Sequence, residues 1–318
     1  MNVPEKYIRH KQNKQTIVVN PFYILSFFRH SLFTILSVGT RKMKIRISIP
    51  QKAEQFAMLF QHVKAFTDHI NISFLEDRMY VQCMDSSRVS IMEITLPSGW
   101  FQSYEYTAST TIGISSSMLY KVLNSREKTQ GVEIDYLDTE TDKLHIHLRN
   151  PEDVPATKTD FEKHFEIPLI DLDEDTMDIP AIEYQAEITI SSYHYATIIN
   201  QLKMFGDTME IQCSEEKIML VSHSPENGKM FVEIKIDDLS SFIIDEGSEL
   251  MLSFSLTYLH NICLYNKIAK EVELQFSKDF PMRLSYFLDS GSVDPESTEI
   301  RPTLSFYLAP KINKETIG

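Results

Sequence analysis

The chain has 318 residues, of which 42% are hydrophobic and 24% charged, and a formal net charge of −14. This composition is typical of a soluble globular protein and excludes collagen, coiled coils and low-complexity disorder. The acidic balance argues against a protein that coats DNA by bulk charge. At about 100–200 residues per domain, the length favours two domains. Cys83, Cys213 and Cys263 match neither a zinc spacing nor a disulfide framework, which favours a reducing compartment.

Residues 1–42 differ in composition from the rest. They hold seven Lys or Arg and one acid, a charge of +6, and because the whole chain carries −14, residues 43–318 carry −20. Their longest charge-free run, Gln15–Phe28, has 14 residues, fewer than the roughly 18–20 that a membrane-spanning helix needs. We therefore expect an extension that is disordered or not native, with Met43 as the natural start. A tail with an attachment role and a membrane or targeting element remain alternatives.

The sequence from Met43 onward contains an internal duplication. Similar segments recur 139 or 140 residues apart, namely 70–85 with 209–224, 111–124 with 251–264, 132–148 with 272–288, and 163–169 with 303–309. A period of this length is too long for a solenoid repeat and indicates a duplicated domain. The predicted organisation is a first domain at 43–169, an acidic proline-bearing linker at 170–184, a second domain at 185–312 and a tail at 313–318.

Each copy is predicted to be α+β, with antiparallel strands and two amphipathic helices. Apolar residues recur at helical spacing, as in Phe56, Leu59 and Phe60, whereas strands such as 231–236 alternate apolar and polar residues. The predicted helices span 52–67, 115–124, 191–205 and 256–265.

Negative charge is missing from the windows that contain these helices. The windows 55–67, 114–126, 191–206 and 253–270 total 60 residues and hold no Asp or Glu, although 44 of the 276 residues from Met43 onward are acidic and about ten would be expected. Exposed helix faces usually accept Glu, so we interpret these faces as surfaces that meet a polyanion. The candidate DNA-facing residues are Lys64, Lys121, Arg126, Lys203, Lys267, Lys270, His62, His194 and His260.

Several short motifs follow one another along residues 44–312. They are Met84-Asp-Ser-Ser-Arg-Val-Ser90, Gly113–Met118, Ile170–Asp173 with Ile179-Pro180, Phe205-Gly-Asp207 and Tyr307–Ile312. In this order they resemble the eukaryotic-type sliding clamp family, proliferating cell nuclear antigen. The resemblance implies a DNA-clamp fold, in which three two-domain subunits close into a pseudo-six-fold ring with sheets outside and helices inside. Such a ring encircles duplex DNA and tethers DNA polymerases, and it needs no cofactor, metal or membrane.

The resemblance also implies a groove that binds partner peptides beneath the linker. Its matching residues are Met84, Arg88, Val89, Ile91, Met177, Ile179, Pro180, Pro281, Tyr307, Leu308 and Ala309. Mobile Met side chains suit a surface that accepts several partners. Arg88 replaces a histidine that is usual in the family. The implied partners are DNA polymerase, the clamp loader and other proteins with clamp-binding peptides, in the nucleus or at a viral replication site.

Subunits are expected to meet by edge-to-edge strand pairing, which uses exposed backbone donors and acceptors. By resemblance the two edges are near 144–149 and 230–236. The interface residues would be Leu144, Ile146, Leu148, Met230, Val232 and Ile234. The resemblance favours a homotrimer, and a subunit of a heterotrimeric checkpoint-type clamp remains the alternative within the family.

An enzyme is the alternative from a different class. The acids Asp171, Asp173, Glu174 and Asp175 resemble a magnesium site for a nuclease. Acids in sequence on an extended linker point to alternating sides, however, and a solvated loop is the simpler interpretation. His145 and His147 lie on one strand face, as metal ligands can, but no Cys or third His stands near them in sequence. With no Gly-rich phosphate loop or nucleophile motif present, we predict a protein that is not an enzyme.

Overall fold

The computed structural model describes residues 42–137, 142–151, 161–172, 176–289 and 300–311. The calls for an extension at 1–42, for metal-binding acids at 173–175 and for a tail at 313–318 therefore fall almost wholly outside the described residues. The first copy of the duplicated module comprises β1 (Lys42–Ile47), α2 (Pro50–Gln61), η1 (Val63–Ala65), β2 (His69–Phe74), β3 (Arg78–Met84), β4 (Ser90–Pro97), η2 (Ser98–Trp100), β5 (Ser103–Tyr106), β6 (Thr110–Ser115), α3 (Ser116–Asn124), β7 (Gly131–Leu137), β8 (Lys143–Arg149) and β9 (Lys163–Pro168).

The second copy repeats this order of strands and helices. It comprises β10 (Ala186–Ser191), α4 (Ser192–Leu202), β11 (Thr208–Cys213), β12 (Ile218–Ser224), β13 (Gly228–Ile234), η3 (Ile236–Asp238), β14 (Ser241–Ile244), β15 (Leu250–Ser255), α5 (Leu256–Cys263), β16 (Glu271–Phe276), β17 (Met282–Phe287) and β18 (Thr303–Leu308). The duplicated α+β organisation predicted from the repeat is present in the structure.

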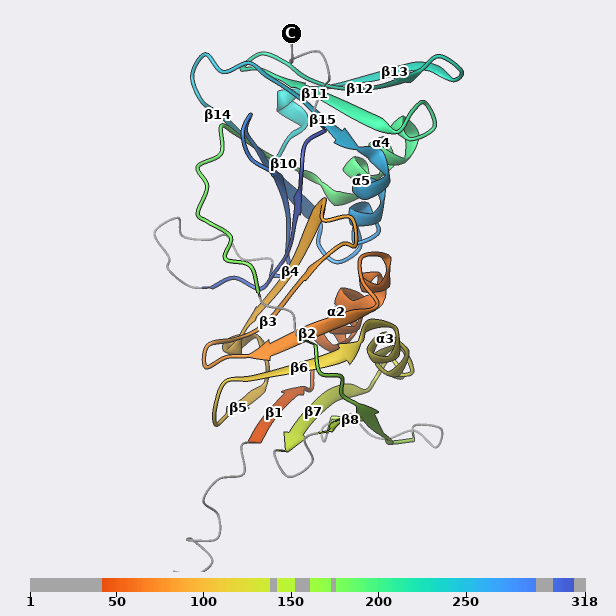
Figure 1. Cartoon of the computed structure of the whole chain (residues 1–318), viewed down its shortest axis with the longest axis vertical. Helices are drawn as coiled ribbons and strands as arrows, with labels where there is room; N and C mark the ends of the chain where they lie inside the picture. The colour runs from red at the N-terminus through yellow and green to blue at the C-terminus, as the bar shows by residue number, and fades with distance from the viewer. Residues whose placement is uncertain (1–41, 138–141, 152–160, 173–175, 290–299, 312–318) are drawn as a thin grey trace, which may run out of the picture. The chain divides into compact units, whose positions relative to one another are not determined.

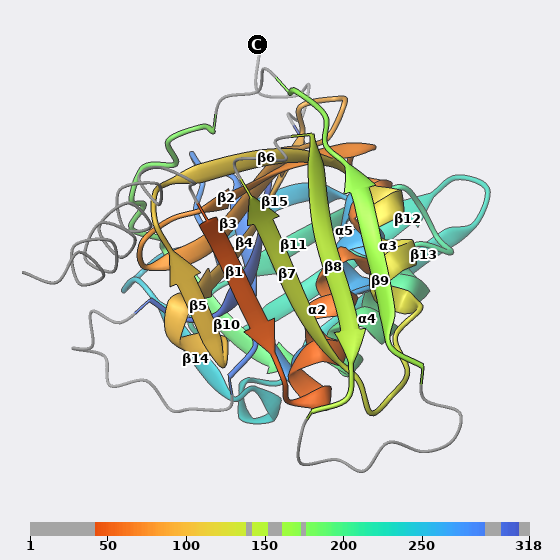
Figure 2. The same cartoon turned by 90° about the horizontal axis from the view of Figure 1, so that it is seen from below.

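Three antiparallel sheets organise the described residues (Figures 1 and 2). A five-stranded sheet has the order β5-β1-β7-β8-β9. A four-stranded sheet has the order β13-β12-β11-β15. A nine-stranded sheet has the order β14-β10-β16-β17-β18-β4-β3-β2-β6. The nine-stranded sheet joins the two copies, because β18 of the second copy pairs with β4 of the first, with Phe306 opposite Met92.

The helices pack in pairs, α2 with α3 and α4 with α5, and lie along one side of this body (Figure 1). The first helix begins two residues earlier than predicted, because Pro50 occupies its first turn, where a fixed φ favours helix and no N–H is needed. It ends at Gln61, and a short 3₁₀ turn follows. The exposed Glu54 lies in α2, outside the window 55–67, so the helices are not wholly free of acids as the windows suggested.

The two copies share one continuous core. Phe306 of β18 stacks on Phe66 with ring centroids 5.3 Å apart and contacts Tyr265 at 5.5 Å. The Gln55 amide of α2 donates hydrogen bonds to the carbonyls of Ile268 and Leu288 at 3.1 and 3.2 Å. These contacts join the helix layer of the first copy to the second copy. Among the described residues, no helix is both long and apolar enough to span a membrane.

Candidate nucleic-acid interface and partner surface

The helix side carries the cations predicted to face DNA. Lys64 follows α2, Lys121 lies on α3, and Lys267 and Lys270 follow α5; all four are exposed, as is His194 on α4. Lys203, after α4, is half-buried. Exposed lysines on α3 and directly after α2 and α5 give a diffuse positive surface, which suits contact with phosphates and carries no sequence information.

Three of the predicted DNA-facing residues are engaged within the protein. The Arg126 guanidinium donates hydrogen bonds to the carbonyls of Glu127, Lys128 and Gln130, so it braces the loop after α3. Burial lowers the pKa of His62, whose ring packs edge-on against Tyr265.

His260 is held in a similar way on α5. Its Nδ1 lies 2.7 Å from Asn200 Oδ1 on α4. Burial, and then the charge of Lys203, lower its pKa. Both shifts of pKa disfavour the charged form of these two imidazoles, so the exposed lysines are the main source of positive charge on this face.

The Met84–Ser90 motif forms a turn built around a buried carboxylate. Asp85 accepts hydrogen bonds from the backbone N–H groups of Ser87, Val89 and Ser90 at 2.6–2.8 Å, and from the Tyr258 hydroxyl of α5 at 2.9 Å. Burial raises the pKa of Asp85, but these four donors outweigh it and hold the pKa below its usual range. Asp85 thus joins the turn to the second copy.

Part of the predicted partner groove forms one cross-strand row on the outer face of the nine-stranded sheet. Met84 of β3 lies opposite Ile91 of β4, which lies opposite Tyr307 of β18. Beside this row the Ala309 N–H donates to the Val89 carbonyl at 3.0 Å. Pro281 directly precedes β17 and is half-buried.

Two residues of the predicted groove differ from the others. The prediction that Leu308 lines the groove is wrong. Its side chain is 0% exposed and points into the core, as those of Leu304 and Phe306 do on the alternating strand β18. Arg88 is exposed at the tip of the Asp85 turn and has a positive φ of 57°.

The linker is fixed to the outer face by a residue that sequence reasoning missed. The Gln82 side chain of β3 donates from Nε2 to the Met177 carbonyl at 2.9 Å and accepts from the Met177 N–H at 2.6 Å. Met177 is 47% exposed, Ile179 half-buried and Pro180 exposed. Gln82 lies two residues before Met84, so the alternation of β3 already placed its side chain on the same face.

The linker also covers a strand edge at its start. The Ile170 N–H donates to the Gly113 carbonyl of β6 at 2.9 Å. A Cβ on Gly113 would lie 2.2 Å from the Ile170 carbonyl oxygen, which explains glycine there. In the second copy, the Lys311 N–H donates to the Ser253 carbonyl of β15 at 2.7 Å. Both copies thus close the same edge with the segment that follows their last strand.

The prediction that Leu144, Ile146 and Leu148 lie at a sheet edge is wrong. They belong to β8, which pairs with β7 on one side and β9 on the other, and their side chains are buried. The edge is β9, which pairs only with β8 among the described strands. The other predicted edge is present: within the described chain β13 pairs only with β12, and Met230, Val232 and Ile234 are half-buried on its inner face.

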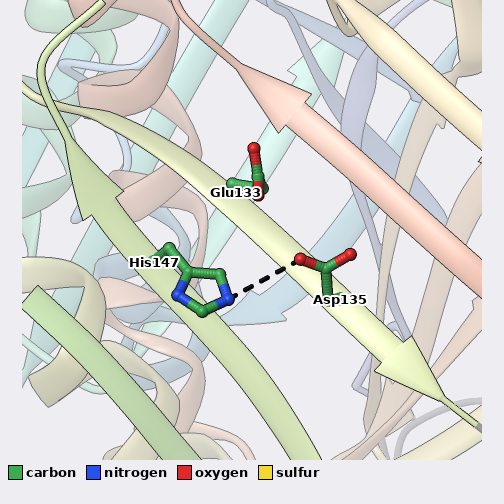
Figure 3. A group of neighbouring side chains, drawn as sticks. All are labelled: Glu133, Asp135 and His147. Atoms are coloured by element: carbon green, nitrogen blue, oxygen red, sulfur yellow. Dashed lines mark ion pairs between the residues drawn. The ribbon is translucent and has the colours of Figure 1, made fainter.

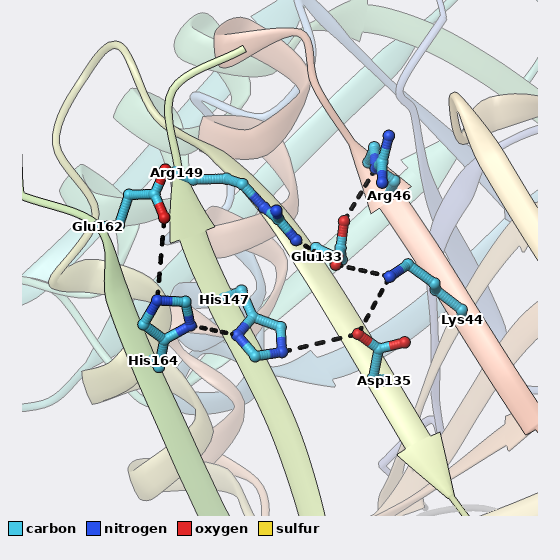
Figure 4. Close-up of polar contacts among 8 residues, drawn as sticks. All are labelled: Lys44, Arg46, Glu133, Asp135, His147, Arg149, Glu162 and His164. Atoms are coloured by element: carbon cyan, nitrogen blue, oxygen red, sulfur yellow. Dashed lines mark hydrogen bonds and ion pairs between the residues drawn. The ribbon is translucent and has the colours of Figure 1, made fainter. Parts of the chain in front are cut away.

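A polar network on the outer face of the five-stranded sheet was also missed (Figures 3 and 4). Glu133 of β7 is 3% exposed and bound by Lys44 and Arg46 of β1, at 2.7 and 2.9 Å, and by Arg149 of β8. Burial raises the pKa of Glu133, but the Lys44 hydrogen bond and the neighbouring cations more than compensate and lower it. Figure 3 shows Glu133, Asp135 and His147 close together, with an ion pair joining only Asp135 and His147.

The two halves of the chain match the two halves of one known family. The N-terminal domain model of proliferating cell nuclear antigen matches residues 49–176, and its C-terminal domain model matches residues 178–295. The chain belongs to the proliferating cell nuclear antigen family. This family of sliding clamps is not enzymatic, so the predicted family, duplicated clamp fold, clamp function and lack of enzymatic activity are confirmed.

Known relatives align along nearly their whole length. The chain is 25% identical to the "DNA polymerase sliding clamp" of Pyrococcus horikoshii over 263 residues, covering 82% of this chain and 96% of the relative. It is 25% identical to proliferating cell nuclear antigen of Chaetomium thermophilum, with 83% and 98% covered. The Saccharomyces cerevisiae protein of that name is 23% identical, with 83% and 97% covered.

Proposed function

We propose that three copies of this chain close into a ring around duplex DNA, with the helices toward the DNA and the partner surface outside. The observation that carries this proposal is the β4·β18 junction inside the chain. The module is duplicated, so the strands equivalent to β4 and β18 should be able to pair in the same way. Those strands are β13 and β9, the two edges described above.

Strand pairing gives the equivalent positions. Cys83 of β3 lies opposite Met92, and Ser222 of β12 lies opposite Met230, so Met230 corresponds to Met92. On the other strand, Leu144 lies opposite Ile167, and Leu284 lies opposite Phe306, so Ile167 corresponds to Phe306. This sets β9 and β18 at an offset of 139, one residue from the alignment made on sequence alone.

The register between two chains follows from the register within one. Because Phe306 pairs with Met92, Ile167 of one copy should pair with Met230 of the next. Phe231 then lies opposite Glu166 of the neighbouring copy, and Val232 opposite Phe165. In the single chain Phe231 is 65% exposed on the edge strand, and an exposed aromatic residue there is suited to burial at a contact.

The small number of lysines on the helix side favours a ring that encircles DNA over a protein that binds DNA tightly. A ring holds DNA by topology, so a few lysines on an otherwise acidic protein suffice to keep the duplex near the wall. A protein that held DNA as a monomer would need many more phosphate contacts.

The partner surface supports tethering of proteins through short peptides. Met84, Ile91 and Tyr307 offer an apolar row beside a linker that Gln82 fixes in place. DNA polymerase and the clamp loader are the partners that the family implies. We propose that this clamp acts where DNA is replicated, in the nucleus of a eukaryotic cell or at a viral replication site.

The mass of the full chain in solution tests the ring. Light scattering should give about three times the chain mass of 36.9 kDa. A double variant tests the register: Phe231→Cys with Glu166→Cys should oxidise to a covalent trimer, because directly opposed strand residues meet the Cα spacing of a disulfide. Phe231→Cys with His164→Cys, two residues out of register, is the control. A monomer, or equal crosslinking of both pairs, would contradict the proposal.

A further inference from the structure

Two histidines from neighbouring strands meet on the outer face of the five-stranded sheet (Figure 4). His147 of β8 lies directly opposite His164 of β9. Their Nδ1 atoms are 2.6 Å apart, and the rings meet edge to face with centroids 4.8 Å apart. An imidazole Nδ1 that bears no hydrogen carries a lone pair, so this rung brings two metal-ligand atoms to one point.

A carboxylate stands at the far nitrogen of each ring. His147 Nε2 is 3.6 Å from Asp135 Oδ2, and His164 Nε2 is 3.9 Å from Glu162 Oε2. These distances are too long for hydrogen bonds, but the negative charge of each carboxylate favours a hydrogen on the nearby Nε2, which leaves the lone pair on Nδ1. In metal sites a hydrogen-bonded carboxylate sets the histidine tautomer in the same sense. Two facing lone pairs repel each other unless a proton or a cation lies between them.

We propose that His147 and His164 bind a divalent transition-metal ion through their Nδ1 atoms, with Zn²⁺ as the representative ion. Neutral imidazole is a preferred ligand of Zn²⁺, Cu²⁺ and Ni²⁺. The Nδ1 atoms are 2.6 Å apart, and two nitrogens about 2.0–2.1 Å from one tetrahedral ion must lie roughly 3.3 Å apart. The His164 side chain is 59% exposed, so its ring can rotate to open this gap, and water can fill the remaining positions. The ion would join β9, an edge strand, to β8. Both imidazoles belong to one chain, so the site does not need the ring to form, although β9 is also the strand proposed to pair with the next copy.

Neighbouring groups show why this rung is favoured over others. Glu133 lies close to Asp135 and His147, but Lys44, Arg46 and Arg149 already bind its carboxylate, and a divalent cation there would face three positive charges. In the next cross-strand pair on the same face of the sheet, His145 lies opposite Glu166, whose carboxylate is bound to Lys143 at 2.8 Å. The His147–His164 rung alone sets two imidazoles against each other among the described rungs of β8 and β9.

Zinc titration of the full chain without a histidine tag tests the site. Competition with a chromophoric chelator should show saturable binding of one Zn²⁺ per chain. His147→Gln and His164→Gln should each weaken it by at least about tenfold, and Asp135→Asn, which acts through His147, by about tenfold. His223→Gln is the matched control, since His223 is an exposed histidine 3.6 Å from a Glu210 carboxylate oxygen, and no described histidine is hydrogen-bonded to its ring.

Binding that survives in the two glutamine variants, or that falls equally in His223→Gln, would overturn the proposal. So would the lack of saturable binding, which would mean that the pair only shares a proton. Circular dichroism checks the fold of each variant, and if His147→Gln unfolds, the more exposed His164→Gln carries the test. Light scattering on the same samples measures the oligomeric state, so the test of the metal site and the test of the ring give separate results. A trimer that binds no zinc overturns the metal site alone, and a monomer that binds zinc overturns the ring alone.

Discussion

The two copies of the clamp module place equivalent strands in opposite situations. β4 and β18 pair inside the chain, whereas β13 and β9 each have one strand neighbour among the described residues. The inward-facing side chains are buried on both kinds of strand, as Phe306 of β18 and its equivalent Ile167 of β9 show, whereas Phe231 of β13 faces outward and is exposed. In the proposed ring, the same module forms one junction by itself and leaves the matching junction to a second chain.

The turns before β4 and β13 also differ, because only the turn before β4 is bonded to the other copy. Before β4, Asp85 holds the turn with three backbone N–H groups and Tyr258 of the second copy. Before β13, the hairpin ends at Gly228 with φ of +79°, a conformation that glycine adopts without strain. The braced turn lies where the copies join, and the plain hairpin lies at the free edge.

Phe306→Ala should have the largest effect on the single chain. The substitution removes a buried ring that contacts Phe66, Tyr265 and Tyr286, and we expect it to lower the free energy of unfolding by about 3–5 kcal/mol. Urea unfolding measures this. Phe231→Ala, on the equivalent junction, should stay within about 0.5 kcal/mol under conditions that keep the chain monomeric. Equal losses would show that Phe231 is packed within the single chain and does not lie exposed on a free edge strand.

Phe231→Glu should instead break the contact between chains. It would lose the burial of an aromatic side chain, about 2 kcal/mol at each junction, and place a carboxylate opposite Glu166 of the neighbouring copy, which is unfavourable. Light scattering across a dilution series should show monomers at concentrations where the unchanged protein is a trimer. Ile243→Glu, on the exposed edge of β14, is the control. A Phe231→Glu trimer of unchanged affinity would contradict the proposed register.

Asp85→Asn should remove a pH-dependent part of the stability. The folded state lowers the pKa of Asp85, so its contribution is present above the ordinary pKa of about 3.9 and is lost as pH falls through the lower folded value. We expect the variant to lose about 2 kcal/mol at pH 7, and the difference from the unchanged protein to shrink below about pH 4. Asp77→Asn, at an exposed pair with Arg78, should change little at any pH. A difference that stays constant with pH would contradict this account.

Much of the fold could be predicted because the duplication and the alternation of apolar and polar residues are both visible in the sequence itself. The offset near 140 paired the copies, and the helix faces were visible in residues such as Phe56 and Tyr195. Alternation does not say which strand lies beside which, so Leu144, Ile146 and Leu148 were placed at an edge that belongs to β9. Leu308 differs for another reason: the motif match places it in the groove, whereas its alternation with Leu304 and Phe306 turns it inward.

Contacts between strands distant in sequence account for the rest. The Gln82 bond to Met177 and the three cations around Glu133 depend on strand register, which composition and motifs do not encode. The histidine rung is similar. The sequence shows His147 beside His145 on one strand, while the histidine that contacts it, His164, lies on the neighbouring strand.

The smallest effect is expected at the partner surface, where the linker crosses from one copy to the other. Met177→Ala with Ile179→Ala should leave the trimer and its unfolding free energy nearly unchanged, because Met177 is exposed and Gln82 holds the linker through backbone atoms. The affinity for a clamp-binding polymerase peptide should fall about tenfold, the equivalent of 1.4 kcal/mol, as two apolar contacts are truncated. Fluorescence anisotropy of a labelled peptide measures this, with Met204→Ala, exposed on the helix side, as control. Unchanged affinity would remove Met177 and Ile179 from the peptide site, whereas an equal loss in Met204→Ala would point to a general effect on the ring.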